Sequence, residues 1–87
     1  MFEVEITREG LRHLNQLPGT VRDAAIQAIL GRIAERPRRV GEPLVGELAR
    51  LHSARRGEYR VIYEIDDDRK VVIVHRVQHR RVVYRRH

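Results

Sequence analysis

The chain of 87 residues contains no cysteine and no tryptophan, and only three prolines. Without cysteine it can form neither a disulfide framework nor a cysteine-ligated zinc site, and it offers no thiol nucleophile. No apolar run approaches the roughly 18–20 residues that span a membrane, and the first residues lack the basic region and long apolar stretch of a secretory signal. We therefore expect a cytoplasmic protein without membrane contact. A chain of this size has one small core, so we expect a single domain over residues 1–87.

Residues that carry familiar catalytic or cofactor chemistry are also scarce. Ser53 is the only serine and stands in no Gly-x-Ser-x-Gly context, and there is no glycine-rich phosphate loop. Three consecutive acids at 66–68, followed by Arg69 and Lys70, are typical of a solvated turn, and the histidines lack metal-binding spacing. The three tyrosines and one phenylalanine are too few for a platform that stacks single-stranded RNA bases. We expect neither a metal nor a cofactor.

Arginine is the residue that the chain has in excess. The formal net charge is +6, and Lys70 is the only lysine among the 18 basic residues. Acidic and basic side chains balance over residues 1–49, so the whole excess lies in residues 50–87. The planar guanidinium binds phosphate through two parallel hydrogen bonds. The basic half is therefore either a surface for a polyanion or an acidic partner, or a solvated tail that aids solubility.

Hydrophobic periodicity predicts the order of the secondary-structure elements. Alternation over residues 2–6 predicts a half-buried strand, and a helix capped by Thr7 is expected from residue 8 to Pro18. A second helix is expected from the candidate cap Thr20 to residue 36, followed by a loop over residues 38–46. A weak strand over residues 50–56 and strong strands over 59–65 and 71–77 complete the pattern. The last two strands are expected to pair as an antiparallel hairpin.

This order predicts an α+β fold, β-α-α-β-β-β, with two N-terminal helices packed on one face of a small antiparallel sheet. Strand alternation points Val61, Tyr63 and Ile65 toward the helices. The same alternation points Arg60 toward the opposite face, which the helices leave open. We expect the functional surface on this open face.

Several side chains of the basic half suit phosphodiester chemistry. In RNA the 2′-hydroxyl is a built-in nucleophile, so a protein need only deprotonate it, protonate the leaving oxygen and stabilise the charged phosphorane. Clustered arginines can perform the last of these tasks. The candidate residues are Arg55, Arg56, Arg60, Arg80 and Arg81, with His52, His79 and Tyr84 as proton carriers.

The segment Gly57-x-Tyr59-Arg60-Val61-x-Tyr63, followed by His79-Arg80 and Val83-Tyr84-Arg85, closely resembles the RelE/ParE toxin superfamily of bacterial toxin–antitoxin systems. It is most similar to the RelE branch, and the resemblance covers essentially the whole chain. The resemblance implies a microbial-ribonuclease-like fold. It also implies a toxin that cleaves mRNA in the ribosomal A site without a metal, inhibits translation and is neutralised by a RelB-like antitoxin.

The same resemblance assigns roles to individual residues. Arg60 matches the strand arginine of the family, Arg80 the arginine that contacts the scissile phosphate, and Tyr84 the stacking and catalytic tyrosine. Leu51 and Ser53 stand where the RelE pattern has two lysines. The candidate substitutes for these lysines are His52, Arg55 and His79, and the further RNA- or ribosome-binding candidates are Arg50, Arg56, Arg81, Arg85 and Arg86.

Two other functions are compatible with these residues. One is a ParE-like inhibitor of DNA gyrase without nuclease activity, since Arg60 and the His79-Arg80 segment occur there too. The other is a catalytically weak toxin that acts mainly in a promoter-binding complex with its antitoxin. The expected partners are the antitoxin, the ribosome and mRNA, with operator DNA bound only through the antitoxin complex. We expect an acidic or helical antitoxin segment to cover the open basic face.

Overall fold

Strand β4 (Tyr59–Asp66) is the centre of a five-stranded sheet in the computed structural model, which describes residues 1–80. The strand order is β1-β5-β4-β3-β2, and the other strands are β1 (Glu3–Ile6), β2 (Glu42–Pro43), β3 (Leu51–Arg56) and β5 (Val71–His79). All four predicted strands are confirmed to within two residues at their ends. The two-residue strand β2 lies inside the segment predicted as a loop, where no alternation is long enough to reveal it.

The two predicted helices are confirmed, with one difference at a cap. Helix α1 (Arg8–Gln16) begins as expected after Thr7, whose hydroxyl accepts the Gly10 N–H at 3.1 Å. Helix α2 (Gly19–Ala28) continues through a π-helical segment, η1 (Ile29–Ile33). The prediction that Thr20 caps α2 is wrong, because the Pro18 carbonyl already accepts the Arg22 N–H at 2.8 Å and the helix starts earlier.

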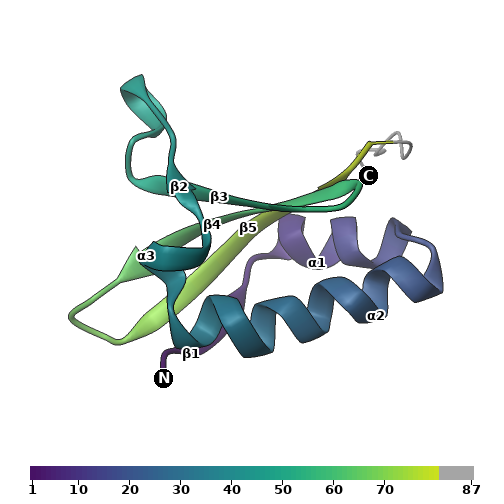
Figure 1. Cartoon of the computed structure of the whole chain (residues 1–87), viewed down its shortest axis with the longest axis horizontal. Coiled ribbons are helices and arrows are strands. Elements are labelled where there is room, and N and C mark those ends of the chain that lie inside the picture. The colour runs from purple at the N-terminus through teal and green to yellow at the C-terminus, as the bar shows by residue number, and fades with distance from the viewer. Residues whose placement is uncertain (81–87) are drawn as a thin grey trace.

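Two short helical segments lie between the long helices and the sheet. Helix α3 (Pro37–Val40) starts with a proline, whose fixed φ suits a first helical position. A single 3₁₀ turn, η2 (Gly46–Leu48), lies between β2 and β3. The segment around η2 rises from the sheet on the side away from α1 and α2 (Figure 1).

The sheet is mixed, which corrects the prediction of an antiparallel sheet. Strands β2, β3, β4 and β5 pair antiparallel, but β1 runs parallel to β5 from Glu3 opposite Val71 to Ile6 opposite Val74. A parallel pair needs a long crossover connection. Here most of the chain separates the two strands, and the alternation in residues 2–6 carries no information about strand direction.

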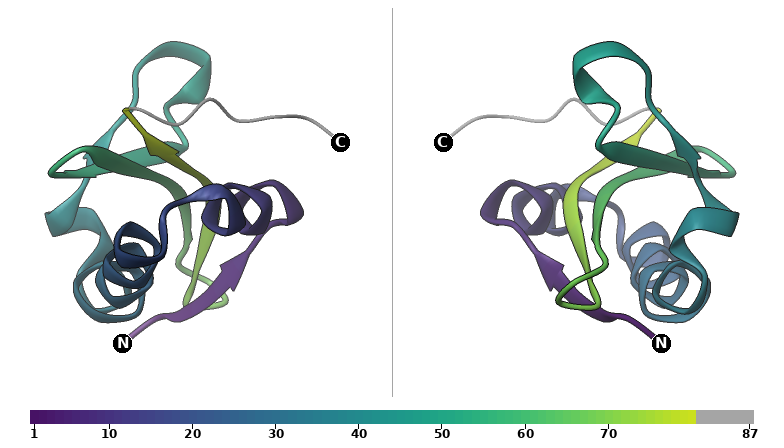
Figure 2. Two further views of the ribbon diagram at one scale, coloured as in Figure 1. Left: turned by 90° about the vertical axis from the view of Figure 1, so that its right-hand side faces the viewer. Right: turned by 90° about the vertical axis from the view of Figure 1, so that its left-hand side faces the viewer.

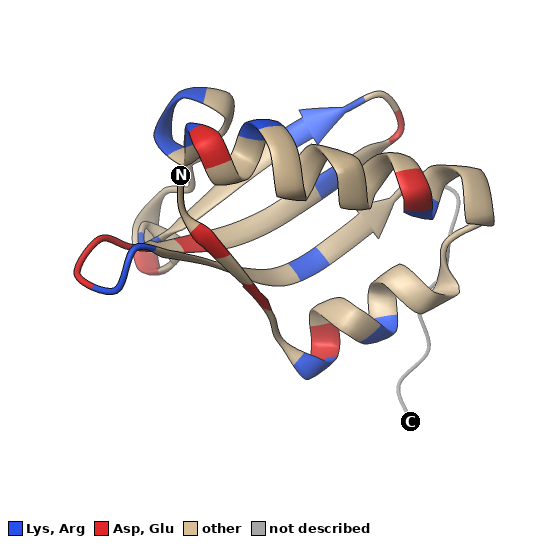
Figure 3. Ribbon diagram, turned by 90° about the horizontal axis from the view of Figure 1, so that it is seen from below, with Lys and Arg blue, Asp and Glu red and all other residues tan. Residues whose placement is uncertain are grey.

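Helices α1 and α2 cover one face of the sheet and leave the other open (Figures 1 and 2). The core lies between these layers, and its residues in β4 are Tyr59, Val61 and Tyr63, as alternation predicts. Arg60 is exposed and belongs to the opposite face, which we call the open face. Seen from the helix side, α1 and α2 carry charges of both signs (Figure 3).

A β-bulge interrupts the pairing of β4 with β5. Ile62 lies opposite Arg76 and Tyr63 lies opposite Val74, so the register of the described strands leaves His75 without a residue opposite it in β4. The bulge changes which residues of β5 face the core. Val72 and Val74 before it and Val77 after it are all fully buried, although simple alternation would separate them.

Helix α1 bonds to the backbone around this bulge. The Thr7 N–H donates to the Val74 carbonyl at 2.9 Å, and the Thr7 hydroxyl donates to the His75 carbonyl at 3.3 Å. The Val77 N–H donates to His13 Nδ1 at 3.2 Å. Because β1 ends at Ile6, these groups of Thr7 and His13 continue the hydrogen bonding of β5 beyond the parallel pair.

The connection after α3 approaches the core closely. The hydroxyl of Tyr63, which is fully buried, donates to the Pro37 carbonyl at 2.5 Å, and burial raises the pKa of Tyr63 to about 12. A Cβ atom at Gly41 would lie 2.2 Å from the Tyr63 hydroxyl oxygen. Only glycine therefore fits at this position. Within residues 1–80, no helix is long and apolar enough to cross a membrane.

We expect Gly41→Ala to destabilise the fold by about 1–3 kcal/mol, the usual cost of forcing extra atoms into a packed site. Gly31→Ala is the matched control, since a Cβ there meets nothing within 4 Å. Alanine at a helical glycine is expected to be neutral or stabilising by up to about 1 kcal/mol. Urea unfolding of both variants tests the contact. Equal stability of the two variants would contradict it.

Acid should weaken the link between α1 and β5. Burial lowers the pKa of His13 in the folded chain, so folding favours the neutral ring that accepts the Val77 N–H. The stabilisation is complete above about pH 6.5, the ordinary pKa in the unfolded chain, and is lost as the pH falls through the lower folded value. Burial also lowers the pKa of His52, which acts in the same direction. In urea unfolding, His13→Gln should show a smaller loss of unfolding free energy between pH 7 and pH 5 than the unchanged chain. An identical loss in both would contradict this role.

Candidate functional site

Three polar side chains form a row across the open face. Arg55 in β3 lies opposite Arg60 in β4, and Arg60 lies opposite Gln78 in β5. All three residues are exposed. Antiparallel pairing therefore places two of the predicted arginines on adjacent strands at the same level of the sheet.

Arg80 extends this row at the end of β5. Its backbone N–H donates to the Glu58 carbonyl at 2.8 Å, which ties the end of β5 to the turn between β3 and β4. A hollow of about 190 Å³ is lined by Arg55, Arg60, Gln78 and Arg80, together with Glu58, Tyr59 and His79. The structure thus brings three predicted site residues, Arg55, Arg60 and Arg80, around one hollow, which we call the arginine hollow.

These three arginines have no carboxylate partner among residues 1–80. The arginines of the described ion pairs are Arg12, Arg38, Arg50, Arg69 and Arg76. A second hollow, of about 480 Å³, shares Arg55 and Arg60 and is bounded by the β2 segment and Ser53. The positive charge on this part of the open face is therefore available to an anionic ligand.

The structure does not bring His52 into the arginine hollow. His52 lies opposite Tyr63, which faces the helices, and the two rings stack with their centroids 5.8 Å apart. Burial, with a smaller contribution from the charge of Arg38, lowers the pKa of His52. Its Nδ1 is buried and has no hydrogen-bond partner in the described part of the chain. As a proton carrier for the open face, His52 is on the wrong side of the sheet.

His79 lies at the border between the two faces. It pairs with Tyr59, which faces the helices, and the residue is 9% exposed, although it contributes to the wall of the arginine hollow. Its Nε2 lies 3.7 Å from a carboxylate oxygen of Glu58. His79 is therefore close to Arg60 and Arg80 but largely enclosed.

Strand pairing places another ionic group on the open face, which the sequence did not single out. Glu64 Oε1 accepts a hydrogen bond from Arg50 Nη1 at 2.9 Å and lies 3.0 Å from His75 Nε2. Glu64 has the same strand parity as Arg60, a signal that was present in the sequence. The position of His75 depends on the bulge, and no local pattern encodes it.

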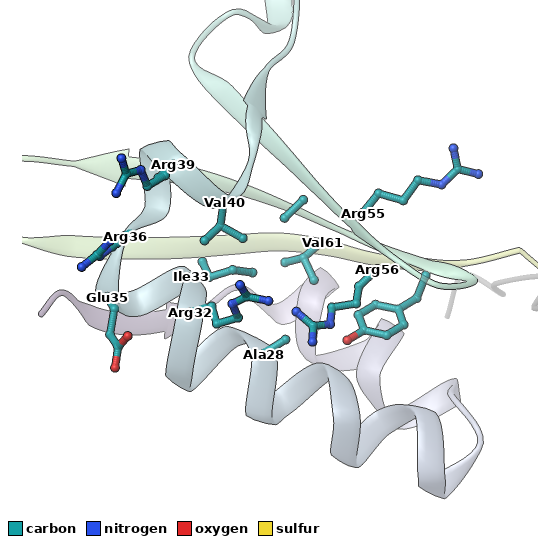
Figure 4. A pocket seen from close by; sticks show the side chains of 12 residues that line it. Ala28, Arg32, Ile33, Glu35, Arg36, Arg39, Val40, Arg55, Arg56 and Val61 are labelled. Carbon is teal, nitrogen blue, oxygen red and sulfur yellow. The ribbon is translucent and has the colours of Figure 1, made fainter.

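A cationic groove lies between α2, α3 and β3, on the helix side of the sheet (Figure 4). Its volume is about 470 Å³. The apolar lining residues are Ala28, Ile33, Val40, Ala54, Tyr59 and Val61, and the charged ones are Arg32, Glu35, Arg36, Arg39, Arg55 and Arg56. In Figure 4, Arg56 points into the groove near Arg32, whereas Arg55 points away from it. Arg56 is thus separated from the row of residues on the open face.

Four predicted site residues, Tyr84, Arg81, Arg85 and Arg86, lie outside the described residues. Of the lysine positions of the RelE pattern, Leu51 is 7% exposed and pairs with Glu64, and Ser53 pairs with Ile62. Within residues 1–80, there is no group of three or more His, Asp or Glu side chains that could hold a metal ion.

Comparison of the sequence with known proteins identifies toxins of bacterial toxin–antitoxin systems as its relatives. A family model described as the ParE toxin of type II toxin–antitoxin systems, parDE, matches residues 4–84. Toxin RelG of Mycobacterium tuberculosis is 42% identical over 85 residues, which cover 98% of each chain. Toxin RelE of the same organism is 39% identical over 84 residues, covering 97% of this chain and 87% of that protein.

Solved structures of RelE toxins have the same fold as this chain. The toxin–antitoxin complex RelBE2 of M. tuberculosis contains a chain with a TM-score of 0.88 and 42% identity, over 91% of this chain and 98% of that one. The isolated RelE toxin of Escherichia coli has a TM-score of 0.77 at 21% identity, over 95% of this chain and 88% of that one, and shows the shared fold. The chain belongs to the RelE/ParE superfamily of type II toxin–antitoxin toxins, and its predicted resemblance to the RelE branch is confirmed.

Proposed function

We propose that this toxin is an mRNA endoribonuclease that acts on the ribosome, with its reaction centre at the arginine hollow. The observation that carries the proposal is the convergence of Arg55, Arg60 and Arg80 around one hollow of the open face. Three guanidinium groups without carboxylate partners among residues 1–80 suit a phosphate that gains charge during a reaction. The proposal implies a cytoplasmic protein, since its substrate is mRNA under translation.

The proposed reaction is an attack of the RNA 2′-oxygen on the adjacent phosphorus. The charge of the phosphorane lies on its non-bridging oxygens, and Arg60 and Arg80 stabilise it by donating hydrogen bonds. Arg55, in the same row, adds positive charge. Tyr84 is proposed to stack on the substrate or to couple to a proton transfer. In this account the ribosome holds the mRNA, with Arg50, Arg81, Arg85 and Arg86 contacting RNA.

We further propose that a RelB-like antitoxin neutralises the toxin and that one of its segments binds in the cationic groove. Relatives of this chain occur in solved RelBE toxin–antitoxin complexes. The groove combines an apolar floor with five arginines and one glutamate on its walls. An amphipathic acidic helix satisfies both features, because its apolar side fits the floor while its carboxylates face the arginines. Such a complex is the one through which operator DNA would be bound.

Substitution of Arg60 or Arg80 by Ala should lower mRNA cleavage on programmed ribosomes by about 10²–10³-fold, the usual effect of removing one donor to a developing oxyanion. Arg8→Ala removes an exposed arginine from α1 and is the matched control. The measurement is primer extension of mRNA 5′ ends after brief expression and in a purified translation system. Intact mRNA together with gyrase-dependent DNA breaks would instead establish a ParE-like activity. Intact mRNA without such breaks would favour a weak toxin that acts in the antitoxin complex.

Charge reversal in the groove should weaken antitoxin binding. We expect the double variant Arg32→Glu, Arg36→Glu to raise the Kd for the cognate antitoxin at least about tenfold, since opposite charges become like charges. Arg8→Glu makes a charge change of the same kind outside the groove and should leave the Kd unchanged. Calorimetry measures the antitoxin complexes of the unchanged toxin and of each variant. If Arg60→Glu weakens binding and the groove variant does not, the antitoxin covers the open face, as expected from the sequence.

A further inference from the structure

The open face holds a histidine and a carboxylate in hydrogen-bond contact. His75 Nε2 lies 3.0 Å from Glu64 Oε1, and the two side chains are 27% and 31% exposed. Both belong to central strands of the sheet, Glu64 to β4 and His75 to β5. The pair is therefore accessible from the solvent while its backbone is held in the sheet.

The contact defines which ring nitrogen of His75 carries the proton. An ionised carboxylate only accepts hydrogen bonds, so Nε2 must be the donor. In the neutral ring the lone pair is then on Nδ1, which is the arrangement of a general base oriented by a carboxylate. Arg50 donates to the same oxygen of Glu64 and fixes its orientation.

The bulge anchors His75 on this face. The carbonyl of His75 accepts the hydroxyl of Thr7, and the carbonyl of Val74 accepts the Thr7 N–H. Because Arg60 pairs with Gln78, His75 lies three residues further along β5, about 10 Å from that level of the sheet. The Arg60 side chain is long. A phosphate bound to it, together with the adjacent ribose, can span this distance.

None of the other histidines of residues 1–80 is exposed on the open face. His13 accepts the Val77 N–H within the core, and His52 stacks on Tyr63 on the helix side of the sheet. His79 lies at the border between the two faces and is 9% exposed. Among the described histidines, His75 alone combines exposure on the open face with a carboxylate that orients its ring.

We propose that His75 is the general base of the cleavage reaction and that Glu64 is its positioning residue, an assignment that rests on the proposed nuclease function. Nδ1 of His75 takes the proton of the 2′-hydroxyl while the 2′-oxygen forms a bond to phosphorus. The bond from phosphorus to the 5′-oxygen breaks, this oxygen takes a proton from water, and the hydroxide so formed takes the proton from His75. The products are a 2′,3′-cyclic phosphate and a 5′-hydroxyl end.

The test is single-turnover cleavage of mRNA on programmed ribosomes. His75→Ala should lower the rate by about 10²-fold or more at an unchanged half-saturating toxin concentration. Added imidazole should restore part of the rate, because it fills the space left by the ring and accepts the proton. Glu64→Ala should lower the rate at least about tenfold without rescue by imidazole, since the ring remains but loses the acceptor that fixes its tautomer. Urea unfolding of each variant verifies that it is folded.

Each outcome has a definite meaning. Loss of rate in His75→Ala with imidazole rescue supports the proposal. Cleavage within about threefold of the unchanged toxin, loss without rescue, or rescue of His52→Ala instead would overturn the role of His75 and leave the nuclease function standing. If the unchanged toxin does not cut ribosome-bound mRNA, the nuclease function and the role of His75 fall together.

Discussion

The β-bulge at His75 is the constraint on which the arrangement of both faces depends. It lets Val72, Val74 and Val77 all point into the core, and it releases His75 from pairing with β4. A bulge disrupts ladder hydrogen bonds and therefore needs other partners for its backbone. Helix α1 provides them through Thr7 and His13. The helix layer thus supports the geometry of the face that it does not cover.

The polar residues lie on two separate surfaces of the molecule. The open face carries the row of Arg55, Arg60 and Gln78, the arginine hollow and the pair of Glu64 with His75. The helix side carries the cationic groove, with its apolar floor and arginine walls. Arg55 contributes to both surfaces. In our account the first surface acts on RNA and the second binds the antitoxin, so Arg55 is the one arginine among residues 1–80 that a phosphodiester and a protein partner share.

The parts of the fold that local patterns encode were predictable. Alternation identified β4 and β5 as a hairpin, and Thr7 was recognisable as the cap of α1, because both signals lie within a few residues. The exposure of Arg60 followed from the same alternation. Strand direction was different: the parallel pairing of β1 with β5 depends on residues far apart in the chain, and local alternation is the same for either direction.

The candidate site was predictable only in part, because strand register also depends on residues far apart in the chain. Arg55, Arg60 and Arg80 were expected together, and the structure brings them around one hollow. The side of the sheet that each histidine occupies depends on register. His52 lies on the helix side of the sheet because β3 pairs it with Tyr63. His75 reaches the open face through a bulge that no local sequence pattern predicts. The sequence therefore pointed to the arginines, whereas the strand register decides on which side of the sheet each candidate histidine lies.

The central claim is that the open face binds RNA and the cationic groove does not. The most direct test is cryo-electron microscopy of the toxin on a ribosome programmed with mRNA that lacks the reactive 2′-hydroxyl. The account predicts a phosphate contacting Arg60 and Arg80, the adjacent ribose next to His75, and an empty cationic groove. An mRNA backbone lying along Arg32, Arg36 and Arg56, with the open face turned away from it, would contradict the account.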